Sequence, residues 1–268
     1  MLKKVIKHEM IATWRIFLPI YIGLVILTAI SCGFAFIVNR VDTEVVTAIL
    51  GMGTVLLILT LMFVLLSPYI VLAVRFYKST ATREAYLTFT LPTTVNTILF
   101  AKFLVGFIWL TITFILWYLS FGLIVCGFTG EEFVATFIKE IFASQSIAMI
   151  LLQLATIIIG LASSVLMIFA SIALSQLVRD HRVLASIAFY FGLYTVQQII
   201  STIILIPVMI EEVGSSLMEE SVSVTAIEPS VDPSLVGTYI VALVVSVIFG
   251  VVCYFVSKYL LSKKLNLL

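Results

Sequence analysis

The sequence predicts an all-α membrane protein with six transmembrane helices, and composition, segment length and charge distribution all point to this class. Hydrophobic residues make up 62% of the chain and charged residues 11%, outside the usual range for soluble domains. A membrane helix needs about 20 apolar residues to cross roughly 30 Å of hydrocarbon. Six stretches without Asp, Glu, Lys or Arg reach that length: 19–38, 47–74, 103–127, 145–178, 183–210 and 237–257.

The charged residues sort to opposite ends of these stretches. If every stretch crosses the bilayer, 13 of the 15 basic residues fall on the side of the N-terminus and 11 of the 14 acidic residues fall on the other. Lys and Arg resist translocation, so we expect the N-terminal side to be cytoplasmic. The prediction is a multi-pass protein with both termini inside, in which Glu9, Glu84 and Asp180 are the acidic exceptions on the cytoplasmic side.

Residues 1–18 precede the first span and have an amphipathic pattern. Apolar residues recur near helical spacing on one side, and basic residues fall largely on the other. Such a helix can lie in the inner headgroup region, with its amines near anionic lipid. We therefore predict an elbow helix over 1–18, with Pro19 in the first turn of the span that follows. A plain cytoplasmic extension of the first span is the alternative. The predicted interface anchors are Lys3, Lys4, Lys7 and Trp14.

The fourth stretch, 145–178, is too long for a perpendicular span, because a helix of that length would reach about 50 Å. We expect it to tilt, to break or to project from the membrane. Gly160, Ser163 and Ser164 lie near its middle and favour close helix approach or a local bend.

The fifth stretch places Thr195, Gln197 and Gln198 near the middle of the bilayer. Unpaired amides are costly there, so these side chains should face other helices or a wet path rather than lipid. Hydrogen bonding between helices and lining of a substrate path are both open interpretations.

Two outer loops have distinct compositions. The segment 128–144 has a spacing that allows a short amphipathic helix on the outer surface. The segment 211–236 is rich in Glu, with Pro229 and Pro233, and is predicted to be a partly ordered acidic extracellular loop.

The one substantial cytoplasmic loop lies between spans two and three. A short helix is predicted within 78–92, because Thr80 or Thr82 can cap its start and Pro92 limits its end. Thr93 or Thr94 can then cap the third span. The aromatic residues of this loop suit docking into a groove on a soluble partner or immersion in the lipid interface, and physical reasoning leaves both interpretations open.

The same loop resembles that of bacterial ABC-2 type permease subunits. The matching residues are Phe76-Tyr77, then Arg83-Glu84-Ala85-Tyr86-Leu87-Thr88-Phe89-Thr90-Leu91-Pro92, then Leu99 and Lys102. The pattern looks most like small Gram-positive exporter permeases for antimicrobial peptides, lantibiotics or phenol-soluble modulins. This chain departs from the family at Thr80-Ala81-Thr82-Arg83, where related loops often have Gly and an acidic residue.

The resemblance implies a bacterial cell-membrane exporter subunit whose loop is a coupling helix gripped by a separate ABC ATPase. ATP and Mg would then be bound by that partner, and this chain would bind no cofactor. A second permease, most simply another copy, would complete the path for amphipathic peptides, and no nucleic acid partner is expected. By resemblance, the residues that contact the ATPase are Arg83, Glu84, Tyr86, Leu87 and Phe89.

Other functional classes have less support in the sequence. No Gly-rich loop ending in Gly-Lys-Ser/Thr is present, so ATP hydrolysis is expected in a partner chain. No Ser-His pair, zinc motif or buried acid pair offers catalysis, and the three cysteines lack metal spacing. We therefore predict a single six-helix permease domain over 1–268, with no catalytic residues and no metal. An ion-coupled secondary transporter and a passive membrane immunity protein are the alternative functions.

Overall fold

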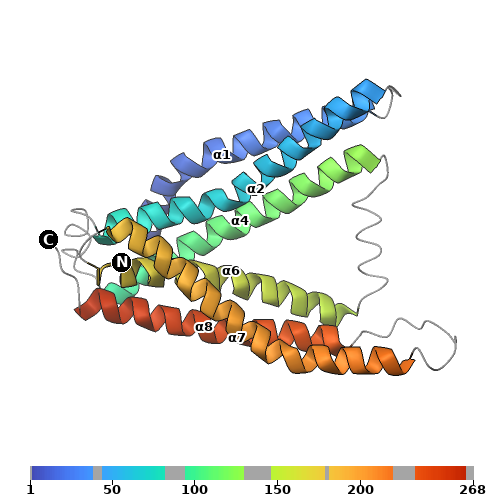
Figure 1. Cartoon of the computed structure of the whole chain (residues 1–268). Coiled ribbons are helices and arrows are strands. Elements are labelled where there is room, and N and C mark those ends of the chain that lie inside the picture. Colours follow the sequence, from blue (N-terminus) through green and yellow to red (C-terminus); the bar gives the residue numbers. More distant parts are fainter. Residues whose placement is uncertain are drawn as a thin grey trace. The chain divides into compact units, whose positions relative to one another are not determined.

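The computed structural model describes residues 2–38, 44–81, 94–129, 146–178, 181–219 and 233–263. Regular structure in these ranges is entirely helical (Figure 1). Each of the six helices is long and apolar enough to cross a membrane, which confirms the all-α class and agrees with a multi-pass membrane protein. The helices are α1 (Leu2–Val38), α2 (Glu44–Ala81), α4 (Val95–Thr129), α6 (Ile147–Ser175), α7 (Arg182–Glu219) and α8 (Pro233–Lys263).

The helices divide into two compact units. Unit 1 contains α1, α4 and α2 up to Lys78, and unit 2 contains α6, α7 and α8. In unit 1, α1 packs along α4, and Leu24, Leu61 and Ile124 join all three helices in one apolar cluster. The indole N–H of Trp117 on α4 donates to the carbonyl of Leu61 on α2 at 3.0 Å, which adds a polar link between those helices.

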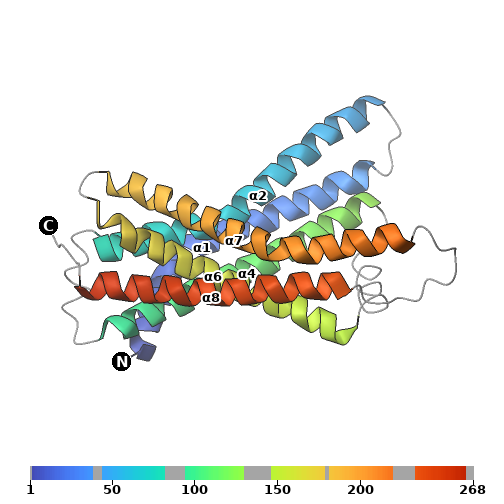
Figure 2. The same ribbon diagram turned by 60° about the horizontal axis from the view of Figure 1, so that its bottom comes forward.

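Unit 2 is a three-helix group in which each helix contacts the other two (Figures 1 and 2). Met167 and Ala170 of α6 pack against Cys253 of α8, and Tyr190 and Leu193 of α7 cover the same cluster. Near the start of α6, the Gln153 amide donates to the hydroxyl of Tyr239 on α8 at 3.3 Å.

The first helix is longer than the predicted span. It is continuous from Leu2 to Val38 and passes through Pro19, so the predicted boundary between an elbow and a span produces no helix break. Proline removes one backbone hydrogen bond, which membrane helices tolerate when neighbouring groups compensate. Ile6 and Met10 pack against a cluster that includes Trp109 of α4. The apolar side of residues 1–18 is therefore partly covered by protein.

Thr94 caps the third predicted span. Its carbonyl accepts from the N–H of Thr97 at 2.9 Å, and its hydroxyl accepts from the same N–H at 3.4 Å. Val95 then begins α4, so the capping prediction is confirmed at Thr94.

Two helices differ from the predicted boundaries or shape. α6 is uninterrupted over 29 residues, so Gly160 and the serines near it do not break it. Its length of about 43 Å still exceeds the hydrocarbon thickness, which leaves tilt or projection as the expected solution. α7 continues through Glu219 and so extends into the segment predicted as the acidic outer loop. No proline interrupts the chain between Pro207 and Pro229, and the first turns after residue 210 stay helical.

The predicted outer-surface helix over 128–144 and the predicted coupling helix within 78–92 fall mostly on residues outside the described ranges, as does most of the acidic segment after residue 219. Residues 128 and 129 belong to α4 and residues 78–81 belong to α2, so Thr80 lies inside α2 and does not cap a separate helix.

Candidate functional site

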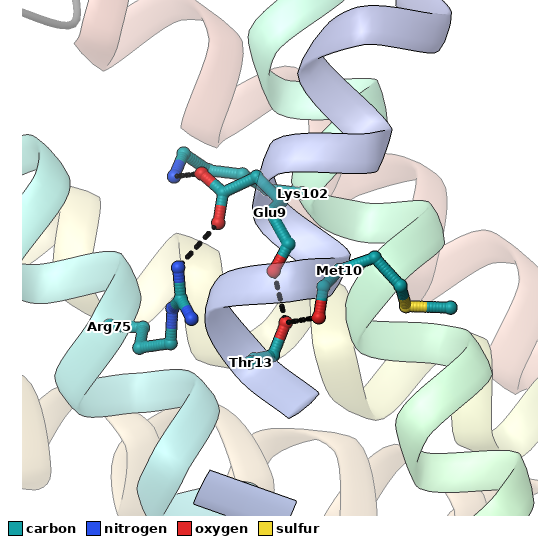
Figure 3. Close-up of polar contacts among 5 residues, drawn as sticks. All are labelled: Glu9, Met10, Thr13, Arg75 and Lys102. Atoms are coloured by element: carbon teal, nitrogen blue, oxygen red, sulfur yellow. Dashed lines mark hydrogen bonds and ion pairs between the residues drawn. The ribbon is translucent and has the colours of Figure 1, made fainter. Parts of the chain in front are cut away.

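Three charged side chains from the three helices of unit 1 meet in one cluster (Figure 3). Glu9 lies on α1, Arg75 on α2 and Lys102 on α4. The Oε2 atom of Glu9 is 2.9 Å from Nη2 of Arg75, and its Oε1 atom is 2.5 Å from Nζ of Lys102. Because each carboxylate oxygen takes a different cation, both ion pairs form together. We call these three residues the ion-pair cluster.

The cluster is partly shielded from solvent. The side chains of Arg75, Glu9 and Lys102 keep 25%, 22% and 10% of their exposure, respectively. Exposed ion pairs contribute little to stability. Removing one partner of a shielded pair is costly, because the remaining charge is then unpaired where water cannot solvate it well. Lys102, the least exposed of the three, therefore depends most on the carboxylate. Two cations around one anion leave the cluster with a net charge of +1.

The same helix faces that carry the cluster continue into an apolar contact. Residues three or four apart share one helix face, so Glu9, Thr13 and Phe17 are aligned on α1. Lys102, Val105 and Trp109 are aligned on α4 in the same way, and Phe17 packs against both Val105 and Trp109. The hydroxyl of Thr13 donates to the carbonyl of Glu9, inside its own helix (Figure 3). The charged and apolar contacts thus form one seam between α1 and α4.

Aromatic rings make up the apolar half of this seam. The rings of Phe17 and Trp109 are stacked with centroids 4.7 Å apart, and Trp109 is 1% exposed. Tyr21 and Trp14 lie 5.9 Å and 5.8 Å from the same indole. The Tyr21 hydroxyl is 2.8 Å from Oγ1 of Thr113, which ties α1 to α4 a second time. We call these four rings the aromatic stack.

The cluster lies near the two helix ends that flank the segment 82–93. Arg75 comes two turns before the end of α2 at Ala81, and Lys102 comes two turns after the start of α4 at Val95. The segment 82–93 between these helices holds the motif that resembles the permease family. Its predicted contact residues Arg83, Glu84, Tyr86, Leu87 and Phe89 lie outside the described residues.

The predicted membrane anchors lie on α1. Lys3, Lys4 and Lys7 are exposed, as expected for side chains that reach headgroups. Trp14 is 54% exposed, yet its ring lies against Trp109 within the aromatic stack, so it has a packing role as well as an exposed edge.

The predicted polar site on the fifth span lies on α7. Thr195 is exposed and donates its hydroxyl to the Phe191 carbonyl at 2.8 Å, within the same helix. Gln198 is exposed and Gln197 half-buried, and neither amide has a hydrogen-bond partner in the part of the chain that the structure describes. The window of highest hydropathy in α7 has no buried residue, so this helix presents the most open surface of the six.

A shallow apolar groove of about 320 Å³ lies between α6 and α8 in unit 2. At its base, a Cβ placed on Gly250 would lie 3.5 Å from Cβ and Oγ of Ser163. The prediction that Ser163 allows close helix approach is therefore confirmed. Gly160 has open space around it and does not share this role. The Ser163 hydroxyl is buried without a hydrogen-bond partner among the described residues.

Sequence reasoning named Glu9 as a cytoplasmic acid but missed its role. The available signal was its position, because Glu9 lies among basic residues and just outside the first apolar stretch, at the level where Arg75 and Lys102 bound the second and third stretches. Three charged residues assigned to one membrane side can meet only if their helix ends are neighbours, and the sequence does not give that neighbourhood.

Among the described residues, no group of three or more His, Cys, Asp and Glu side chains is placed to hold a metal ion. Comparison of the chain with known protein families, with curated proteins and with solved structures finds no match.

Proposed function

We propose that the chain is the transmembrane subunit of an ATP-driven exporter of the ABC-2 type, whose α2–α4 loop docks on a separate ATPase. One observation carries the proposal. The segment with the family-like motif joins two long apolar helices, α2 and α4, whose ends near the loop are both ion-paired to α1. A partner that moves this loop would therefore act on three helices of the bundle at once.

Within this proposal the loop residues divide into two roles. Tyr86, Leu87 and Phe89 supply apolar anchors that fill a groove on the ATPase, because aromatic side chains bury large areas at few rotatable bonds. Arg83 and Glu84 set the register by charge. The first turns of α1, with Lys3, Lys4, Lys7 and Trp14, act as the elbow that holds unit 1 at the inner lipid surface.

The cargo proposed is an amphipathic peptide. The six spans are apolar, with hydroxyls and amides thinly distributed, which suits an amphipathic molecule better than a free ion or sugar. The open surface of α7, with Thr195, Gln197 and Gln198, is proposed to line the path or to contact a second permease, since amides exposed to hydrocarbon are costly. Both termini would be cytoplasmic in a bacterial cell membrane.

The test is a double variant, Tyr86→Ala with Phe89→Ala, in the full chain with its native membrane partners. Loss of two aromatic anchors should weaken the docking of the ATPase by about 100-fold or more. Purification of the tagged chain should then recover little nucleotide-binding partner, and cargo should not stimulate ATP hydrolysis. The control is Phe34→Ala with Phe63→Ala, at exposed positions of unit 1, which should leave both measurements unchanged.

Normal partner recovery and normal stimulated hydrolysis in the loop variant would contradict the docking role. Transport that follows an ion gradient in vesicles without any ATPase would favour an ion-coupled carrier instead.

A further inference from the structure

The ion-pair cluster joins segments that the loop separates. Arg75 lies before the loop, Lys102 lies after it, and both bind the carboxylate of Glu9 (Figure 3). Glu9 is the one acidic residue in the sequence of α1. The two ends of the loop therefore have a common attachment point on a third helix.

This attachment depends on the carboxylate of Glu9, because the cluster contains no second anion. Without Glu9, the guanidinium of Arg75 and the ammonium of Lys102 would face each other with no anion between them. Arg cannot lose its proton, and Lys102 is too shielded for water to screen it well. Loss of the carboxylate therefore converts two attractions into a repulsion between the last turns of α2 and the first turns of α4.

The aromatic stack packs α1 firmly against α4, so a movement of the charged residues would displace α1 as a whole. Phe17 and Trp109 lie two turns from Glu9 and Lys102 along the same helix faces. Displacement of the charged ends would therefore rotate or slide α1 and α4 about a packed contact, rather than bend one helix alone.

We propose that Glu9 is a positioning residue that fixes the spacing of the two loop ends and transmits movement of the loop to α1. The spacing role stands on the ion pairs alone. The transmission role rests on the proposed function, since it requires a partner that moves the loop.

The spacing role is tested by a distance measurement that needs no ATPase. Spin labels are placed on Val74→Cys of α2 and Asn96→Cys of α4, both exposed, in a chain whose three native cysteines are replaced by serine or alanine. Pulsed electron–electron double resonance then gives the distribution of distances between the two spin labels. Glu9→Gln should shift this distribution to longer distances and broaden it.

Two further variants keep this test falsifiable if Glu9→Gln does not fold. Lys102→Gln leaves a neutral pair between Glu9 and Arg75, and should lengthen the distance because α4 alone is released. The triple exchange Glu9→Lys with Arg75→Glu and Lys102→Glu keeps opposite charges at both contacts of residue 9, and should return the distance toward that of the unaltered chain. An unchanged distribution in Glu9→Gln and in Lys102→Gln would overturn the inference.

Arg15→Gln is the matched control, because Arg15 is an exposed cation on α1. Its distance distribution should equal that of the unaltered chain. A shift equal to that of Glu9→Gln would show that any change of charge on α1 is sufficient, which would also overturn the inference.

The transmission role is tested on the same variants in vesicles with the native partner. Glu9→Gln should keep the nucleotide-binding partner on purification but lower cargo-stimulated ATP hydrolysis by about tenfold, the range of coupling between neighbouring charged groups. If the partner is retained and stimulation is normal, transmission through Glu9 is refuted. If no nucleotide-binding partner is recovered with any variant, the proposed function fails, and the distance measurement still decides the spacing role.

Discussion

Unit 1 and unit 2 join their helices by different means. In unit 1 the contacts between α1 and α4 are made by long side chains, namely the ion-pair cluster and the aromatic stack. In unit 2, α6 and α8 meet at Ser163 and Gly250, whose small size lets the backbones approach, and the hydrogen bond between Gln153 and Tyr239 adds a polar contact. The contact in unit 1 depends on particular charged and aromatic groups, whereas the contact at Ser163 and Gly250 in unit 2 depends on side chains that are small or missing.

This difference has a consequence for movement. A seam of small residues packs at one distance and has little tolerance for separation, because dispersion contacts fall off steeply with distance. An ion pair falls off slowly with distance, so long charged side chains can follow a helix that shifts by a fraction of a turn. The ion-pair cluster of unit 1 can therefore keep α2 and α4 attached to Glu9 while the two loop ends move together, whereas the small-residue contact of unit 2 resists separation of its helices.

The largest effect is expected from the loss of Trp109 in unit 1. Trp109→Ala empties the centre of the aromatic stack and should lower the free energy of unfolding by about 3–5 kcal/mol. The measurement is the midpoint of thermal unfolding in detergent, followed by the loss of monodisperse protein.

Trp109→Phe is the control for this prediction. Phenylalanine keeps a ring against Phe17 and removes an indole N–H that has no hydrogen-bond partner in the described part of the chain. Its midpoint should therefore lie much closer to that of the unaltered chain. An equal drop in the thermal midpoint of Trp109→Ala and Trp109→Phe would mean that the aromatic stack does not hold α1 on α4.

The corresponding change in unit 2 enlarges the small-residue contact. Gly250→Leu forces bulk between α6 and α8 and should cost about 1–3 kcal/mol, since added atoms in a packed interface displace helices. Gly250→Ala should be nearly neutral, because a Cβ there meets Ser163 and Leu166 at 3.5–3.6 Å, an ordinary contact distance. Thermal midpoints of the two variants give the test. An unchanged thermal midpoint in Gly250→Leu would show that α6 and α8 are not held at this distance.

The sequence is sufficient to predict the helices, but it does not predict which face of each helix is buried. Segment length and charge distribution predict six spans, and capping chemistry predicts that α4 begins after Thr93 or Thr94, of which Thr94 is the cap in the structure. Apolar residues surround α4 on all sides, however, so no amphipathic pattern indicates that Trp109 rather than Phe100 is buried. In a membrane both faces are apolar, and contact is decided by shape, which requires the neighbouring helix.

The ion-pair cluster was hidden for a related reason. Topology placed Glu9, Arg75 and Lys102 on one side of the membrane, but 66 and 93 residues separate Glu9 from its two partners along the chain. Pairing at such separations depends on which helix ends are neighbours. The prediction that Pro19 lies in the first turn of a span is wrong, because α1 begins at Leu2 and continues through the proline.

The smallest effect is expected at the hydrogen bond between Tyr21 and Thr113. The Tyr21 hydroxyl lies 2.8 Å from Oγ1 of Thr113 and donates to the Trp109 carbonyl at 3.4 Å, and the Thr113 hydroxyl donates to the same carbonyl at 2.8 Å. Tyr21→Phe then leaves no donor unpaired at Thr113 and should cost about 0.5–1 kcal/mol, the usual value for such bonds between membrane helices.

A double-mutant cycle with Thr113→Val isolates this bond. Each single variant removes the contact between the two hydroxyls, so the double variant should cost less than the sum of the two single costs. Strict additivity would mean that the bond contributes nothing measurable, and that the aromatic rings alone set the register of α1 on α4. Since rings can slide past one another at little cost whereas a hydrogen bond fixes one position, a non-additive result would assign the register to Tyr21 and the strength of the contact to Trp109.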